Sequence, residues 1–251
     1  MAQLHELVDF LDTQLRIGEI PDYPSALNGL QLENGGEVTK LGAAVDASLP
    51  VIEKAIAAGV DLLIVHHGLF WQGAQPVTRA HYQKLKMAMD AGMAIYSAHI
   101  PLDVHPRWGN NVLLAGVLGM QNPEPFFPWK GIELGLAENL DVTLTDLLQK
   151  LSDVLGSRVH VCRGYGDDVG RVGVITGGAG SEVADVHAAG INTFVTGEGP
   201  HWSYPMAEEL GLNVVYGGHY ATETFGVRAL AEELSGLQSI EWVFVDHPTG
   251  L

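Results

Sequence analysis

The sequence is poor in cysteine and in basic residues. Its 251 residues include one cysteine, Cys162, which excludes an intrachain disulfide and a zinc site built on several thiolates. Lys and Arg number 13 against 30 Asp and Glu, giving a formal net charge of −17. Because nucleic acids are bound by several basic side chains on one face, this balance argues against a nucleic-acid partner. It suits the binding of cations instead.

Long hydrophobic runs are also missing. The longest stretch without Asp, Glu, Lys or Arg covers residues 62–78 and contains two histidines, two glutamines and a proline, so no membrane partner is expected. Residues 1–16 carry three acidic residues and no basic segment before an apolar run, so we expect no secretory signal. With 47% apolar residues, the composition favours an acidic α/β protein of the cytoplasm.

One unit of sequence occurs twice. Ala57-Ala58-Gly59 returns 131 residues later as Ala188-Ala189-Gly190, and each is followed by a short apolar run. Further along, an apolar run leads to His-x-x-x-carboxylate in both copies, as His99 to Asp103 and as His219 to Glu223. The order of apolar runs and helical patterns is β-α-β-α-β in each copy, which predicts parallel strands.

We therefore expect an α/β fold made of two similar subdomains from an internal duplication, each a mostly parallel sheet with flanking helices. The ranges are 1–126 and 127–251. Helical periodicity is expected at residues 4–15 and 144–155. Three prolines within residues 121–128 indicate a linker between the halves. Residues 240–245 are expected to close the second sheet, although the sequence leaves open whether this strand and the last helix pack on the first half.

Residues suited to metal binding follow four of the predicted strands. Ligands in α/β sheets lie beyond the carboxyl ends of strands. The residues at these ends are His66 and His67, His99 and Asp103, Glu198 with the weaker candidate His201, and His219 and Glu223. Imidazoles and carboxylates without thiolates suit zinc, iron or manganese and do not choose among them. In an extended strand His66 and His67 would point to opposite sides, which favours two ions over one.

Other interpretations stay open for several residues. A histidine at a strand end is often a hydrogen-bonded core residue. The segment from Gly177 to Gly180 fits a tight turn better than a phosphate-binding loop, because it lacks the Lys-Ser/Thr of a P-loop. Four tryptophans near the expected site or linker would line a pocket or an interface, namely Trp71, Trp108, Trp129 and Trp202.

Five segments together resemble the Nif-three-like family, also called the dinuclear-metal-centre hexameric family, whose members are often named GTP cyclohydrolase 1 type 2 homologues. These segments are Asn28-Gly-Leu-Gln31, Val65-His66-His67-Gly68, His99-Ile-Pro-Leu-Asp103, Thr196-Gly-Glu198 and Gly218-His219-Tyr-Ala-Thr-Glu223. The chain is similar to the short form of the family, without an inserted domain.

The resemblance implies two divalent metal ions per chain. His67 and Asp103 would hold one ion, His66 and His219 the other, and Glu223 would bridge them. His99 and Glu198, as the copies opposite His219 and His67, would orient ligands or transfer protons in catalysis.

The resemblance also implies a homohexamer and hydrolysis of a small-molecule substrate, with GTP as one candidate, by water activated at the metals. A non-catalytic protein that binds or delivers metal, or that regulates a partner, is the alternative. A third hypothesis is that the metals only connect the two halves.

Overall fold

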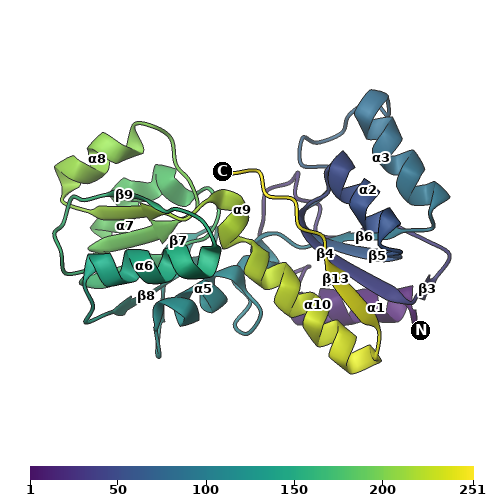
Figure 1. Cartoon of the computed structure of the whole chain (residues 1–251), viewed down its shortest axis with the longest axis horizontal. Coiled ribbons are helices and arrows are strands. Elements are labelled where there is room, and N and C mark those ends of the chain that lie inside the picture. The colour runs from purple at the N-terminus through teal and green to yellow at the C-terminus, as the bar shows by residue number, and fades with distance from the viewer. The chain divides into compact units, whose positions relative to one another are not determined.

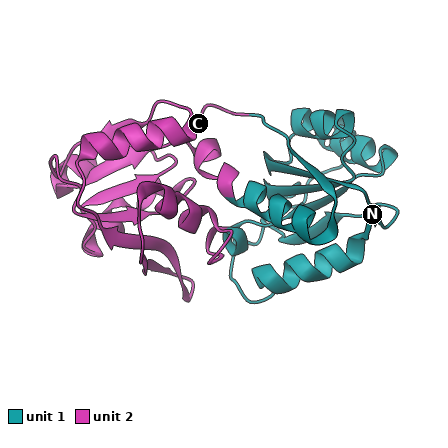
Figure 2. Cartoon of the chain, turned by 60° about the horizontal axis from the view of Figure 1, so that its bottom comes forward, with its two compact units in different colours: residues 1–102, 226–247 teal, residues 103–225, 248–251 magenta.

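The computed structural model describes residues 1–251 and divides into two compact units. Unit 1 comprises Met1–Leu102 and Gly226–His247, and unit 2 comprises Asp103–Phe225 and Pro248–Leu251 (Figure 2). These units differ from the expected ranges 1–126 and 127–251, because the chain returns to unit 1 near its C-terminal end.

Unit 1 is built on a five-stranded sheet. Its strands, in spatial order, are β13 (Glu241–Phe244), β4 (Lys40–Asp46), β5 (Leu62–His67), β6 (Ala94–Ser97) and β2 (Gly29–Leu32). The first four are parallel, and β2 is antiparallel to β6. Two short strands, β1 (Ala2–Gln3) and β3 (Glu37–Val38), form a separate antiparallel pair. The carboxyl ends of β4, β5 and β6 therefore lie along one edge of the sheet.

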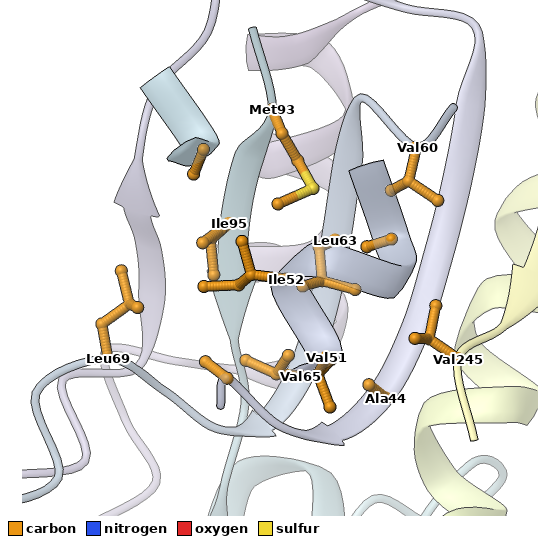
Figure 3. Packing of buried hydrophobic residues seen from close by; sticks show 13 residues of the cluster. Ala44, Val51, Ile52, Val60, Leu63, Val65, Leu69, Met93, Ile95 and Val245 are labelled. Atoms are coloured by element: carbon orange, nitrogen blue, oxygen red, sulfur yellow. The ribbon is translucent and has the colours of Figure 1, made fainter. Parts of the chain in front are cut away.

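Helices cover both faces of this sheet, with α2 and α3 on one face and α1 and α10 on the other (Figure 1). Their bounds are α1 (Leu4–Leu15), α2 (Leu49–Ala57), α3 (Arg79–Asp90) and α10 (Thr224–Gln238). Ser48 caps α2 by accepting a hydrogen bond from the backbone N–H of Val51. Between α2 and the sheet, Ile52 packs with Leu63 and Ile95 in a fully apolar core (Figure 3). Burial of this face fixes the strand register that positions the residues beyond β5.

Unit 2 contains a six-stranded mixed sheet. Its strands, in spatial order, are β7 (Glu124–Trp129), β8 (Ile132–Asn139), β10 (Arg171–Val174), β11 (Thr193–Thr196), β12 (Asn213–Tyr216) and β9 (His160–Cys162). The three strands β10, β11 and β12 are parallel, and the strands outside them pair antiparallel. The α/β fold is thus confirmed, with parallel strands at the centre of each sheet.

Two apolar cores cover the faces of the second sheet. One joins α5 and α6 to the sheet, and the other joins α7 and α8 to its opposite face. The helices are α5 (Asn110–Leu118), α6 (Leu144–Leu155), α7 (Val183–Ala188), which follows the 3-10 turn η1 (Ala179–Glu182), and α8 (Ser203–Leu210). Two four-residue helices complete the chain: α4 (Ile100–Asp103) and α9 (His219–Thr222). No helix has the length and apolar character needed to cross a membrane.

Two expectations about connections were wrong. The proline-rich segment is not a linker, because β7 forms the outer strand of the second sheet, where proline is tolerated, and buries Phe126 and Phe127. The last strand, β13, does not close the second sheet but pairs in parallel with β4 of the first.

The repeated pattern corresponds to repeated local structure. Helices α1 and α6 have the bounds expected from periodicity, residues 4–15 and 144–155. Gly59 and Gly190 both follow a helix with φ near +75°, at +74° and +79°, a conformation that glycine adopts without strain. Leu41 pairs with Leu62 in unit 1, and Val172 with Thr193 in unit 2, which keeps the same offset between strands.

Candidate metal site

His66 and His67 are the last two residues of β5. His66 is fully buried, and its Nδ1 lies 2.8 Å from the carbonyl oxygen of Ala98. The Nδ1 of His67 lies 2.9 Å from Oδ1 of Asp46, at the end of the neighbouring strand. Since both partners are acceptors, each Nδ1 carries the proton and each Nε2 carries the lone pair that can bind a metal.

The two rings do not splay to opposite sides as an extended strand suggested. Their centroids are 4.8 Å apart, with Nδ1 of His66 directed at the carbonyl oxygen of Ala98 and Nδ1 of His67 at Asp46. Alternation along the strand therefore does not separate these two rings, and the number of ions stays a prediction.

His99 joins these two histidines from the segment after β6. Its ring centroid lies 4.9 Å from that of His66 and 5.6 Å from that of His67. Its Nδ1 lies 2.8 Å from Oδ1 of Asp22, and both side chains are about nine-tenths buried, with 10% and 7% exposed. One ligand atom from each of His66, His67 and His99 lies within 4.8 Å of the others, so these three residues could hold a metal ion.

Asp22 is held as an anion by four donors. Its Oδ1 accepts from His99 and from the backbone N–H of Tyr23, and its Oδ2 accepts from Asn28 and from the backbone N–H of Ile100. Burial acts to raise the pKa of Asp22, but the hydrogen bond and charge of His99 and the other donors outweigh it. The pKa of this carboxyl therefore lies below its ordinary value of 3.8.

Gln31 joins the loops around this histidine cluster. Its Nε2 donates to the carbonyl oxygens of Ala26 and Leu27, and its Oε1 accepts from the backbone N–H of Leu69. Gly68 packs so closely against this amide that a Cβ there would collide with it. The Asn28-to-Gln31 and His-His-Gly motifs are thus parts of one hydrogen-bonded scaffold.

Unit 2 places a second set of donors after β12. His219 begins α9 and Glu223 follows it, so the segment coils as the His-x-x-x-Glu spacing predicted (Figure 1). The Nδ1 of His219 lies 2.9 Å from Oε1 of Glu198, and its Nε2 lies 3.1 Å from Oε2 of Glu223. Burial acts to lower the pKa of His219, but the two carboxylates outweigh it and raise the pKa to about 9. His219 and Glu223 thus offer a nitrogen and a carboxylate oxygen side by side.

The glycine-rich segment after β10 makes room for these donors. Gly177 has φ +70°, and a Cβ at this position would collide with the Glu223 carboxylate. The backbone N–H groups of Gly177 and Gly180 donate to Thr222 and Glu198. Because these two amides already have protein acceptors, they are not available to a phosphate group, and the segment is better described as a tight turn.

Asp103 is the remaining predicted ligand. It is buried in unit 2, where its Oδ1 accepts from Nδ2 of Asn110 at 2.8 Å and lies 3.3 Å from the Thr176 hydroxyl. Thr176 is the neighbour of Gly177 in sequence. A buried carboxylate oriented by an amide and a hydroxyl is a suitable oxygen donor for a divalent cation.

Most of the predicted residues fall into two clusters, one on each unit. Unit 1 holds His66, His67 and His99, and unit 2 holds Asp103, Glu198, His219 and Glu223. His201 is exposed. Cys162 is buried, and burial raises the pKa of its thiol to about 11, in keeping with a core residue. Sequence reasoning missed the acceptors Asp22 and Asp46, since neither lies near a histidine in sequence.

The chain belongs to the Duf34/NIF3 (NGG1p interacting factor 3) family. The family model matches residues 2–249, nearly the whole chain. This confirms the resemblance seen in the motifs.

Relatives and solved structures agree with this assignment. A Deinococcus radiodurans protein named GTP cyclohydrolase 1 type 2 homolog is 41% identical over 248 residues, covering 98% of this chain and 94% of its own. The crystal structure of TTHA1606 from Thermus thermophilus matches with a TM-score of 0.87 and 41% identity, over 99% of this chain and 100% of its own. The protein ybgI, described as of unknown function, matches with a TM-score of 0.91 and 32% identity, over 99% and 100% of the two chains.

Proposed function

We propose that this chain binds two divalent metal ions and is a metal-dependent hydrolase of a small molecule. The observation that carries the proposal is that His66, His67 and His99 bring nitrogen atoms within 4.8 Å of one another, which places His99 beside the two histidines that we propose as ligands. The side-chain Nδ1 atoms are directed at Ala98, Asp46 and Asp22, which leaves the lone pairs on Nε2. Histidines that bind metals have this kind of acceptor behind them.

The chemistry of the donors fits zinc, iron or manganese. Imidazole nitrogens and the carboxylates of Asp103 and Glu223 suit these ions, and the one thiol, Cys162, takes no part. The resemblance implies that donors from both clusters bind the same pair of ions, and this stays a prediction.

Different residues of the chain would have different roles in the proposed hydrolysis. Bound divalent ions would supply Lewis acidity, which makes water a stronger nucleophile and stabilises negative charge on the substrate. His99, fixed by Asp22, presents Nε2 as a base that can take a proton and return it to a leaving group. Glu198 fixes the ring of His219 through Nδ1 and so acts on the site through that ligand.

The substrate and the assembly are further parts of the proposal. The name of the Deinococcus radiodurans relative makes GTP the first substrate to test. With a net charge of −17, the chain needs bound cations to accept a triphosphate. A homohexamer, as the resemblance implies, is tested by sedimentation equilibrium of the purified protein.

Metal analysis of the purified chain tests the binding step. We expect about two ions per chain, with losses when the five proposed ligands, His66, His67, Asp103, His219 and Glu223, are changed to alanine one at a time. Failure to bind zinc, iron or manganese under any loading condition would contradict the proposal.

His99→Ala separates an enzyme from a metal carrier. If His99 transfers protons, this variant keeps its metal and loses hydrolysis of GTP. If the metals serve delivery alone, the wild type exchanges metal and turns over no nucleotide. If the His99→Ala variant loses its metal, His99 is instead assigned as a ligand.

A further inference from the structure

Two exposed aromatic side chains adjoin the histidine cluster of unit 1. Tyr23 and Trp71 retain 47% and 38% of their surface exposed. The Trp71 ring lies 4.6 Å from that of His99 and 5.3 Å from that of His67, centroid to centroid. Tyr23 lies 6.3 Å from Trp71 and 6.1 Å from His99. Two large aromatic rings that remain exposed side by side next to the histidine cluster form a surface on which a ligand could bind.

The geometry of the rings leaves a stacking surface. Trp71 meets Tyr23, His67 and His99 at interplanar angles of 74°, 52° and 67°. These neighbours contact the indole by edges or at a tilt, and none of the three lies parallel to it. An offset, parallel ring is the arrangement in which an indole face best binds a planar ligand.

Both rings are carried on loops that hydrogen bonds hold in place. Asp22 accepts from the backbone N–H of Tyr23 and from His99, so one carboxylate fixes both. Gln31 ties the loop after Tyr23, at Ala26 and Leu27, to Leu69 in the turn that carries Trp71. Such a surface loses little entropy when a ligand binds.

The charges around this surface restrict the ligand. Asp22 and Asp46 stand behind His99 and His67, and the chain as a whole is strongly acidic. The faces of indole and phenol rings are also electron-rich. A neutral, nitrogen-bearing heteroaromatic ring with N–H donors therefore fits better than a ring that carries a carboxylate.

We propose that Tyr23 and Trp71 form a stacking site for a planar nitrogen heterocycle of the purine type, beside His67 and His99. This inference rests on the proposed function, since it deepens that function by naming the residues that would bind the base of the substrate. The ring would stack on Trp71 and border Tyr23, while His99 faces the same space from the sheet edge.

The test uses 2-aminopurine riboside, a planar base whose fluorescence falls when it stacks. Titration of the full chain is expected to quench the probe, with guanosine as a competitor and ribose as an inactive control. Trp71→Leu and Tyr23→Leu should each weaken binding about tenfold, which is the size of one base–ring stacking interaction. Trp71→Phe should restore part of the affinity.

Matched controls and metal content make the outcomes separable. The matched controls are Tyr82→Leu and Trp129→Leu, which should bind the probe as the wild type does. Tyr82 is 49% exposed on α3, and Trp129 lies at the end of β7. Metal analysis of Trp71→Leu should show wild-type content. If the chain takes up no metal under any loading condition and still binds the probe through Trp71, the proposed function is overturned and the stacking site is retained.

Three results would overturn the stacking site itself. One is a metal-loaded wild type that does not quench the probe. Another is quenching that the Trp71 and Tyr23 variants leave unchanged. The third is a change of molecular mass in those variants without a change in probe affinity, which would make the rings a subunit interface.

Discussion

The two units differ most at matching ends of their central strands. In unit 1, Asp46 at the end of β4 accepts a hydrogen bond from His67 at the end of β5. The residues 131 positions later are Gly177 and Glu198. Gly177 stands where unit 1 has Asp46, and it leaves space for the Glu223 side chain. Glu198 stands where unit 1 has His67, and it lies within hydrogen-bond distance of His219.

This exchange changes the chemistry of each unit while the framework stays the same. Unit 1 offers imidazole nitrogens, with its carboxylates behind them as acceptors. Unit 2 offers the carboxylates of Asp103 and Glu223 among its donors, with His219 between two acids. The repeated strand–helix scaffold therefore places an imidazole at position 67 of unit 1 and a carboxylate at the matching position 198 of unit 2.

Removal of the buried Glu223 carboxylate should have the largest effect on metal binding. Glu223→Ala is expected to lower metal affinity by more than about 100-fold, since the loss of an outer partner alone costs 10 to 100-fold. Competition with a fluorescent zinc chelator measures the change. Glu223→Gln, which keeps the size without the charge, should also bind weakly. Full metal content in both variants would show that Glu223 is not a ligand.

A side chain at Gly177, where unit 2 has space for Glu223, should have the second-largest effect. Gly177→Ala introduces a Cβ that collides with Glu223 and forces φ +70° on an L side chain. We expect a loss of about 1–2 kcal/mol in the free energy of unfolding, together with weaker metal binding. Urea denaturation and chelator competition measure the two effects.

Gly178→Ala is the matched control for this change. A Cβ there would lie 3.6 Å from the His219 ring, an ordinary contact, so this variant should stay within about 0.5 kcal/mol of the wild type. Equal losses at both glycines would refute the special role of Gly177.

The acids that orient histidines should have similar effects in the two units. Asp46→Ala and Glu198→Ala are each expected to weaken metal binding by about 10- to 100-fold, because the ring of His67 or His219 loses its fixed orientation. Both acids are partly exposed, so stability should change little. Glu6→Ala, at an exposed acid in the first turn of α1, serves as the control. Weaker metal binding in only one of the two variants would contradict the proposal that Asp46 and Glu198 have equivalent roles.

Asp22→Asn should produce the smallest change and a characteristic pH dependence. The pKa of Asp22 is lowered on folding, so its charge stabilises the native chain above about pH 3.8, and this contribution is lost as the pH falls through the lower native value. We expect a difference of about 1 kcal/mol between wild type and variant at neutral pH, the excess of a charged over a neutral hydrogen bond.

Urea denaturation at a series of pH values tests this assignment. The gap in the free energy of unfolding should stay constant from pH 7 to pH 5 and shrink at lower pH, because protonated Asp22 resembles asparagine. A gap that persists in acid, in a chain that is still folded, would rule out the charge as its source.

The sequence by itself determined the α/β class, the bounds of α1 and α6 and most of the candidate donors. Periodicity of 3.6 residues marks a helix locally. The His-x-x-x-carboxylate spacing brings the two side chains together if the segment coils after the strand, and the segment from His219 to Glu223 does coil. These features depend on neighbours within a few residues along the chain.

Tertiary structure alone decided the rest. Pairing of β13 with β4, and of β7 with β8, depends on which sheet edge each strand can reach, and local pattern does not encode that. The contacts of Asp22 with His99 and of Asp46 with His67 join residues 77 and 21 positions apart. Asp46 meets His67 because two parallel strands end at the same edge of the sheet. Asp22 meets His99 because it precedes the antiparallel strand β2, whose first residue, Gly29, pairs with Ser97 at the end of β6.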